Sequence, residues 1–288
     1  MKSIVLFVAS ILLLGVLIPT TVTLYPGQLF NQVLAEPVTG TDGDDNLEGS
    51  DNDDDIEGKG GDDHIDSKGG NDRNTGDKKE GDGDGGNDNI DSGDGNDENI
   101  GDNEFGGGNG GDDNINSGDG FDINTGDNFF GDGDGGDDVI NSGDANDVNR
   151  GDNFLGNGNG GDDVINSGDG FVDKNIGDNE FGGGNGGDDV INSGTGDDTN
   201  IGDNDEGDGD GGNDFIKSGK GNDINFGDNR FDSGLSAGGN DKINAAQGDD
   251  ELTGGGGADK FKCGSGDDTV TDFNEAEGDK ASGNCEIT

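Results

Sequence analysis

A single aliphatic position recurs along most of this chain. Isoleucine stands between glycine-, aspartate- and asparagine-rich stretches at Ile65, Ile90, Ile115, Ile140, Ile165, Ile191 and Ile216, with successive spacings of 25, 25, 25, 25, 26 and 25 residues. Alternation about one apolar residue predicts a short strand with one buried face. A fixed period of this size predicts a solenoid of stacked coils rather than a globular core, so these residues should form one continuous isoleucine column.

Each unit contains a second nonapeptide in which asparagine replaces the aliphatic residue, as in residues 92–100. The asparagines are Asn74, Asn99, Asn124, Asn149, Asn175, Asn200 and Asn225. Inward-facing asparagines at equal height can bond to one another as an amide ladder, which would satisfy their buried donors and acceptors. The alternative is a row of solvent-exposed polar residues, the usual environment of asparagine.

A third segment of seven residues closes each unit and brings its length to 25, as in residues 126–132. It starts with Gly-Asp-Asn in all units but the first, and its fifth position is mostly apolar: Phe105, Phe130, Leu155, Phe181 and Phe231, with Glu80 and Glu206 as exceptions. We expect a third, shorter wall whose rings pack in the core. An exposed aromatic stripe that binds sugar or another partner is the alternative.

Aspartate occupies the position two residues before each inward-facing strand residue. These aspartates are Asp45, Asp54, Asp63, Asp72, Asp88, Asp97, Asp113, Asp122, Asp138, Asp147, Asp163, Asp173, Asp189, Asp198, Asp214, Asp223, Asp241, Asp250, Asp259 and Asp268. Stacked coils would bring their carboxylates into columns that repel unless cations lie between the coils.

The repeats resemble the RTX, or haemolysin-type, calcium-binding nonapeptide Gly-Gly-x-Gly-x-Asp-x-U-x, where U is aliphatic. Residues 40–48, 49–57 and 58–66 are three consecutive copies, and the register returns near the end at Asp241, Asp250, Asp259 and Asp268. The resemblance implies an all-β fold, a parallel β-solenoid or β-roll, with coils of about 25 residues in the middle and nonapeptide coils at both ends. It also implies that the sixth-position aspartates bind several Ca²⁺ ions together with turn carbonyls.

Composition agrees with a fold that depends on ions. The chain has 288 residues, of which 66 are glycine and 24% are hydrophobic, and its formal net charge is −53. Too little apolar surface is available to offset the entropy of ordering, so the chain without ligands should be disordered. The charge excludes nucleic acid and an anionic membrane surface as partners. Calcium ions are the predicted partners, and the sequence leaves open whether a glycan, ice or a second copy of the chain also binds.

The termini differ from the repeats. An apolar run from Ile4 to Ile18 follows Lys2, which predicts that residues 1–35 are a cleaved signal peptide or an N-terminal membrane anchor. Residues 36–39 are expected to form a linker, 40–271 the repeat solenoid, and 272–288 a cap on its open end. Cys263 and Cys285 are the only cysteines, and in an exported chain they should form a disulfide.

The sequence predicts a secreted or cell-surface protein that folds on binding extracellular calcium and has a structural, matrix or surface role. The alternatives are a calcium-dependent ice-binding or glycan-binding adhesive module, and the accessory repeat region of a secreted hydrolase. No enzymatic activity is expected, because His64 is the only histidine and falls at an outward strand position, and the periodic carboxylates favour metal binding over a unique acid and base.

Overall fold

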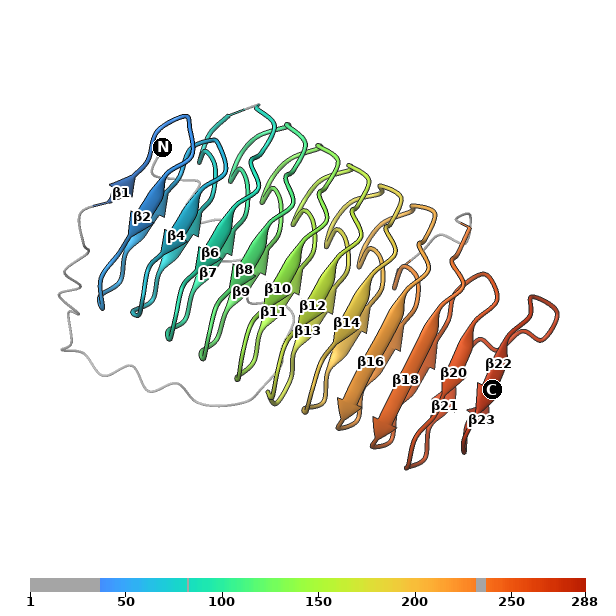
Figure 1. Ribbon diagram of the computed structural model, residues 1–288. Helices are drawn as coiled ribbons and strands as arrows, with labels where there is room; N and C mark the ends of the chain where they lie inside the picture. The colour runs from blue at the N-terminus through green and yellow to red at the C-terminus, as the bar shows by residue number, and fades with distance from the viewer. Residues whose placement is uncertain (1–36, 82, 232–236) are drawn as a thin grey trace, which may run out of the picture. The chain divides into compact units, whose positions relative to one another are not determined.

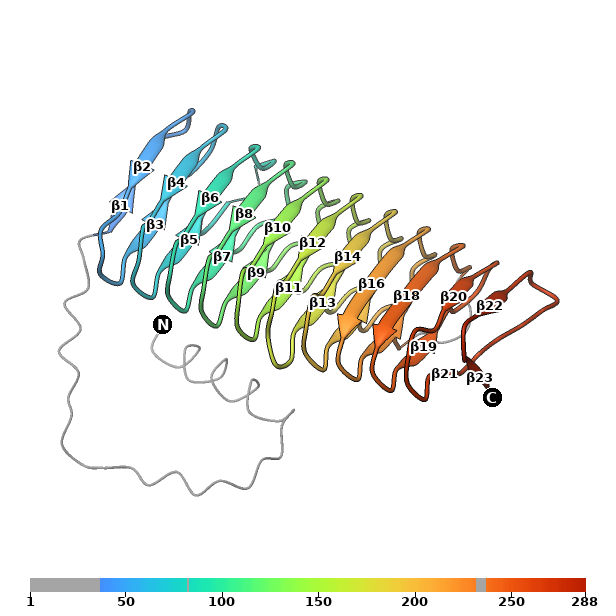
Figure 2. The ribbon, with the colours of Figure 1, turned by 60° about the horizontal axis from the view of Figure 1, so that its bottom comes forward.

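Two parallel β-sheets run along the chain in the computed structural model, which describes residues 37–81, 83–231 and 237–288. These residues form 23 strands and no helix. The even-numbered strands pair in order in an 11-stranded sheet and the odd-numbered strands in a 12-stranded sheet (Figure 1, Figure 2). The predicted all-β parallel solenoid is therefore confirmed. No helix among the described residues is long and apolar enough to span a membrane, and the predicted export segment, residues 1–35, lies outside the described residues.

The strands are short and evenly placed. The even-numbered sheet contains β2 Asn46–Glu48, β4 His64–Asp66, β6 Asn89–Asp91, β8 Asn114–Asn116, β10 Val139–Asn141, β12 Val164–Asn166, β14 Val190–Asn192, β16 Phe215–Lys220, β18 Lys242–Gln247, β20 Lys260–Lys262 and β22 Lys280–Ser282. The odd-numbered sheet contains β1 Val38–Thr39, β3 Asp55–Glu57, β5 Arg73–Thr75, β7 Glu98–Ile100, β9 Ile123–Thr125, β11 Val148–Arg150, β13 Lys174–Ile176, β15 Thr199–Ile201, β17 Ile224–Phe226, β19 Glu251–Thr253, β21 Thr269–Val270 and β23 Glu286–Ile287.

Strand pairing extends beyond the expected limits of the solenoid. β1 lies in the segment expected to be a linker and pairs with β3. β22 and β23 lie in the tail expected to cap the open end, and they pair with β20 and β21. The tail is thus the last coil of both sheets, and the predicted disulfide between Cys263 and Cys285 ties it to the preceding coil.

Each coil turns sharply between its two sheets. Gly118 in the turn from β8 to β9 has φ +78°, and a Cβ there would lie 2.2 Å from the carbonyl oxygen of Gly93 in the neighbouring coil. Glycine is required here both for its left-handed backbone and for the close approach of successive coils. This explains the recurrence of glycine at the same place in the turns of the later coils, whereas Lys68 holds the same positive φ of +78° in the first long coil.

The interior combines an apolar column with a polar one. The isoleucines of the even-numbered sheet are fully buried. The asparagines of the odd-numbered sheet are also fully buried, and they form the predicted amide ladder: Asn124 Nδ2 donates to Asn149 Oδ1 at 2.9 Å, and Asn149 Nδ2 to Asn175 Oδ1 at 2.9 Å. Each amide also meets a serine hydroxyl, such as Ser142 Oγ at 3.0 Å from Asn149. The solvent-exposed alternative is wrong.

The third wall corrects one expectation. Its apolar fifth position lies outside the core, with Phe105 48% and Leu155 49% exposed and with Phe130 and Phe181 half-buried. The rings of Phe105 and Phe130 stack at 5.1 Å between centroids, so part of each face is covered by the neighbouring coil. The preceding position packs inward instead and carries both rings and charges, including Phe154 and the buried Glu180 that pairs with Arg150.

Candidate metal centre

The predicted aspartates form two columns, one before each sheet. Within both columns, each carboxylate after the first accepts a hydrogen bond from the backbone of its equivalent in the neighbouring coil. Asp88 N–H donates to Asp113 Oδ1 at 2.6 Å before the even-numbered sheet, and Asp97 N–H donates to Asp122 Oδ1 at 2.9 Å before the odd-numbered sheet. This bond fixes one oxygen of each carboxylate and directs the other into the space between coils.

That second oxygen has no hydrogen-bond partner in most of these aspartates. Buried and unpaired Oδ2 atoms occur at Asp63, Asp72, Asp88, Asp97, Asp113, Asp122, Asp138, Asp147, Asp163, Asp173, Asp189, Asp198, Asp214, Asp223, Asp241, Asp250 and Asp268. An unpaired buried polar atom is costly. Its regular repetition indicates that each position meets a ligand that is not part of the chain.

Three of the four outermost positions are satisfied by the chain itself, whereas Asp268, the last of the odd-numbered column, keeps an unpaired Oδ2. In the first coil, Thr41 donates its backbone N–H and hydroxyl to Asp45 Oδ2 at 2.5 and 2.8 Å, and Ser50 donates in the same way to Asp54 at 2.6 and 3.1 Å. At the other end, Asp279 continues the even-numbered column, where its Oδ2 accepts the backbone N–H of Asn274 at 2.7 Å. Asp45 and Asp54 were predicted as ligands like the rest, but their carboxylates differ from the interior ones.

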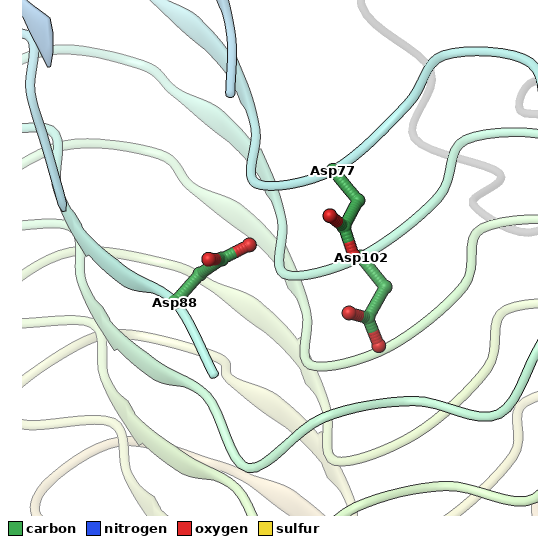
Figure 3. A group of neighbouring side chains, drawn as sticks. All are labelled: Asp77, Asp88 and Asp102. Atoms are coloured by element: carbon green, nitrogen blue, oxygen red, sulfur yellow. The ribbon is translucent and has the colours of Figure 1, made fainter. Parts of the chain in front are cut away.

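Sequence reasoning missed a third column, formed by the aspartate that follows the first glycine of each seven-residue segment. In the last segment this is Asp228, which is buried and accepts the backbone N–H of Gly239. The other six are Asp77, Asp102, Asp127, Asp152, Asp178 and Asp203, and all are buried. Each of these six carboxylates accepts the backbone N–H of a glycine nine residues later, as in Gly111 N–H to Asp102 Oδ2 at 2.9 Å, which closes the third wall. Figure 3 shows Asp77 and Asp102 from successive coils, with Asp88 pointing toward them from the opposite wall.

The third column and the even-numbered column converge on five clusters of three buried aspartates. In each cluster, one oxygen from every carboxylate lies within 4.8 Å of the others. The clusters are Asp77, Asp88 and Asp102; Asp102, Asp113 and Asp127; Asp127, Asp138 and Asp152; Asp152, Asp163 and Asp178; and Asp178, Asp189 and Asp203. We call these eleven residues the third-side array, and we call Asp72, Asp97, Asp122, Asp147, Asp173, Asp198, Asp223, Asp250 and Asp268 the turn column.

Glycines make room for the third-side array. A Cβ at Gly110 would lie 1.5 Å from Asp127 Oδ1, and a Cβ at Gly101 would lie 1.8 Å from both Asp113 Oδ2 and the carbonyl oxygen of Gly126. A larger residue at either position would displace a carboxylate. The second contact also shows that backbone carbonyl oxygens line the same space, so that the sites offer both kinds of oxygen ligand.

The pKa values of these aspartates also favour binding of cations between the coils. Burial, followed by repulsion from Asp102 and Asp88, raises the pKa of Asp113 well above its usual range, and burial and neighbouring aspartates act in the same direction on the pKa of Asp138. In the turn column, burial raises the pKa of Asp97 to about 6 and the pKa of Asp122 to about 8, while the backbone hydrogen bond to each carboxylate opposes the shift. Nearby cations would restore the charged form in both places.

The donor set fits Ca²⁺. Carboxylate and carbonyl oxygens are the ligands of hard cations, and calcium accepts six to eight of them in flexible geometries. A model of the RTX calcium-binding nonapeptide repeat matches residues 39–73, 184–199 and 236–270, in four copies. The chain carries RTX calcium-binding nonapeptide repeats. RTX repeats bind Ca²⁺, so this solenoid is a calcium-binding β-roll.

The RTX matches cover both ends of the solenoid and one segment in its middle. Two of the three matched segments therefore lie where the coils are short and contain only nonapeptides. Comparison with curated proteins and with solved structures finds no match. The third-side array lies mostly outside the matched segments, because only Asp189 falls within one of them.

Proposed function

We propose that this RTX solenoid is a secreted or cell-surface protein that folds when it meets extracellular calcium and then serves as a rigid structural element. The observation that carries the proposal is the repetition of buried carboxylate oxygens without partners in both columns. Such a chain cannot complete its sites where calcium is scarce, whereas extracellular calcium modules bind with dissociation constants of about 10⁻⁴–10⁻³ M.

The disulfide between Cys263 and Cys285 supports the extracellular location, because disulfides persist in oxidising compartments. We also propose that the chain is not an enzyme. His64 lies exposed on β4, where its ring contacts the Asn89 side chain at 3.1 Å. The carboxylates that could serve as acids and bases repeat identically from coil to coil, which suits metal binding better than a single reaction centre.

The test is a calcium titration followed by far-ultraviolet circular dichroism. In chelator at neutral pH we expect an unfolded spectrum, and we expect cooperative gain of β-structure as calcium reaches roughly the millimolar range, since site formation and folding are one event. Magnesium at the same concentration is the control and should do less, because it demands tighter octahedral geometry and retains its water. A spectrum that chelator leaves unchanged would overturn the proposal.

A further inference from the structure

The third-side array is continuous, because consecutive clusters share an aspartate. Asp102 belongs to the first and second clusters, Asp127 to the second and third, Asp152 to the third and fourth, and Asp178 to the fourth and fifth. In contrast, Asp88, Asp113, Asp138, Asp163 and Asp189 each belong to one cluster. A shared aspartate therefore contributes to two sites and an unshared one to a single site, although both are buried carboxylates.

The charge of the array repeats with the coil. Each coil adds one third-column aspartate and one aspartate from the even-numbered column. Among the ion pairs of the described residues, none joins a lysine or arginine to a member of the array. Two carboxylates per coil are neutralised by one divalent cation per coil. A monovalent ion would leave each coil negative, and a trivalent ion would leave it positive.

Unpaired carboxylate oxygens in each cluster are a second indication of a bound cation, independent of the charge balance. Asp113 is 2% exposed, and Asp138 and Asp163 are each 1% exposed, yet the Oδ2 atom of each has no hydrogen-bond partner. In the third column, Asp102 Oδ1, Asp152 Oδ2 and Asp178 Oδ2 are buried and unpaired in the same way. Each cluster thus presents ligand atoms from two walls of the solenoid.

We propose that the third-side array is a second class of calcium site, distinct from the sites of the turn column, that takes one divalent cation per cluster and in which each interior third-column aspartate bridges two cations. This proposal rests on the proposed calcium-dependent function and assigns it a specific ligand set. Because a bridging carboxylate is a ligand of both neighbouring sites, filling one site orients a ligand of the next. The five sites should therefore fill as a coupled unit.

The test compares aspartates from the same position in different coils. Asp152 bridges two clusters, whereas Asp77 belongs to the first cluster alone. We expect Asp152→Asn to remove two bound calcium ions per chain and Asp77→Asn to remove one, counted by equilibrium dialysis with radioactive calcium at a free concentration that saturates the wild-type chain. Asp138→Asn, a one-cluster residue in a middle coil, should also remove one ion. This variant shows whether the larger loss in Asp152→Asn comes from bridging or only from a position in the middle of the solenoid.

Asp144→Asn is the matched control, since Asp144 is exposed, lies in the same long coil and belongs to none of the aspartate columns; it should leave the number of bound ions unchanged. Circular dichroism at saturating calcium checks that each variant folds. If Asp152→Asn does not fold, Asp127→Asn replaces it, because Asp127 also bridges two clusters. Equal losses from bridging and one-cluster variants would overturn the proposal. A wild-type chain that binds no calcium would instead overturn the proposed function itself.

Discussion

In the short coils at the two ends of the solenoid, both inner columns are apolar, whereas the longer coils between them place asparagine opposite isoleucine. Ile56 of β3 pairs with Asn74 of β5 where the first long coil begins, and Asn225 of β17 pairs with Leu252 of β19 where the last one ends. The change from aliphatic to amide therefore coincides with the appearance of the third wall.

This coincidence shows how cohesion is divided along the molecule. The end coils add apolar contacts through Leu252, Phe261 and Val270, and one of them is closed by a disulfide. The central coils bury one isoleucine column, and they replace the second apolar column with hydrogen bonds between coils and with carboxylates that require cations. The stability of the central coils should therefore depend on pH and on the asparagine side chains. The stability of the C-terminal coil should depend on the disulfide.

The largest expected effect is that of pH on the calcium-free chain. Burial, followed by repulsion between aspartates, raises the pKa of Asp88 to about 9, whereas an unfolded aspartate titrates near pKa ~3.9. The folded state therefore holds more protons between these values, and the stability that they confer is present at low pH and is lost as pH rises.

In chelator we accordingly expect more β-structure by circular dichroism at about pH 5 than at about pH 8. Hydrogen exchange, corrected for the intrinsic effect of pH, should place the gain in the central coils more than in the first coil, where Ser50 already bonds Asp54. Saturating calcium is the control and should abolish most of the difference. A calcium-free chain that gains structure as pH rises would show the comparison to be wrong.

The next effect is that of Asn149→Leu, which gives a central coil the inner residue of an end coil. It breaks two ladder bonds, from Asn124 and to Asn175, and each buried group left unpaired costs about 1–3 kcal/mol. We expect the free energy of unfolding in calcium to fall by about 2–5 kcal/mol in urea titrations, since apolar contacts of the leucine offset part of the loss.

Asn225→Leu is the matched control, because Asn225 is the last rung: it accepts one ladder bond, from Asn200, and its neighbour on the other side is Leu252. Its loss of stability should be about half that of Asn149→Leu. If the two variants are equally stable, the ladder does not contribute rung by rung.

The most local effect is that of opening the disulfide. Cys263 and Cys285 are 22 residues apart, and closing a loop of this length stabilises by about 3 kcal/mol in the chain-entropy model. The double variant Cys263→Ser and Cys285→Ser should exchange faster in β22 and β23, while peptides from β10 to β13 keep wild-type rates. Faster exchange throughout the solenoid would mean that the end coil supports the centre after all.

Much of the fold could be predicted from the sequence, because residues that recur at a constant interval take equivalent positions in successive coils. The isoleucine period predicted the strands of one sheet, the asparagine period predicted the ladder, and two lone cysteines predicted the disulfide. The outward position of Phe105 was predicted wrongly. In a strand, alternation says which side chains face inward, but the seven-residue third segment is not a regular strand and offers no such rule.

The third-column ligands were missed for a related reason. The sixth-position aspartates were assigned through resemblance to a nonapeptide, and a nonapeptide has no third wall. The signal was present nonetheless, since aspartate follows glycine in every third segment, even in the first, where Lys78 replaces asparagine. Which carboxylates converge depends on the height and direction of that segment relative to Asp88 and its equivalents, and spacing alone does not contain this information.

Closure of three of the four outermost carboxylates by Thr41, Ser50 and Asn274 gives the molecule a modular length. The start and the finish are specified by local residues, whereas each internal rung specifies only its neighbours. Duplication or deletion of one 25-residue unit would therefore preserve both ends and every kind of contact between them. A lineage could lengthen or shorten this rod in whole steps without redesigning anything else.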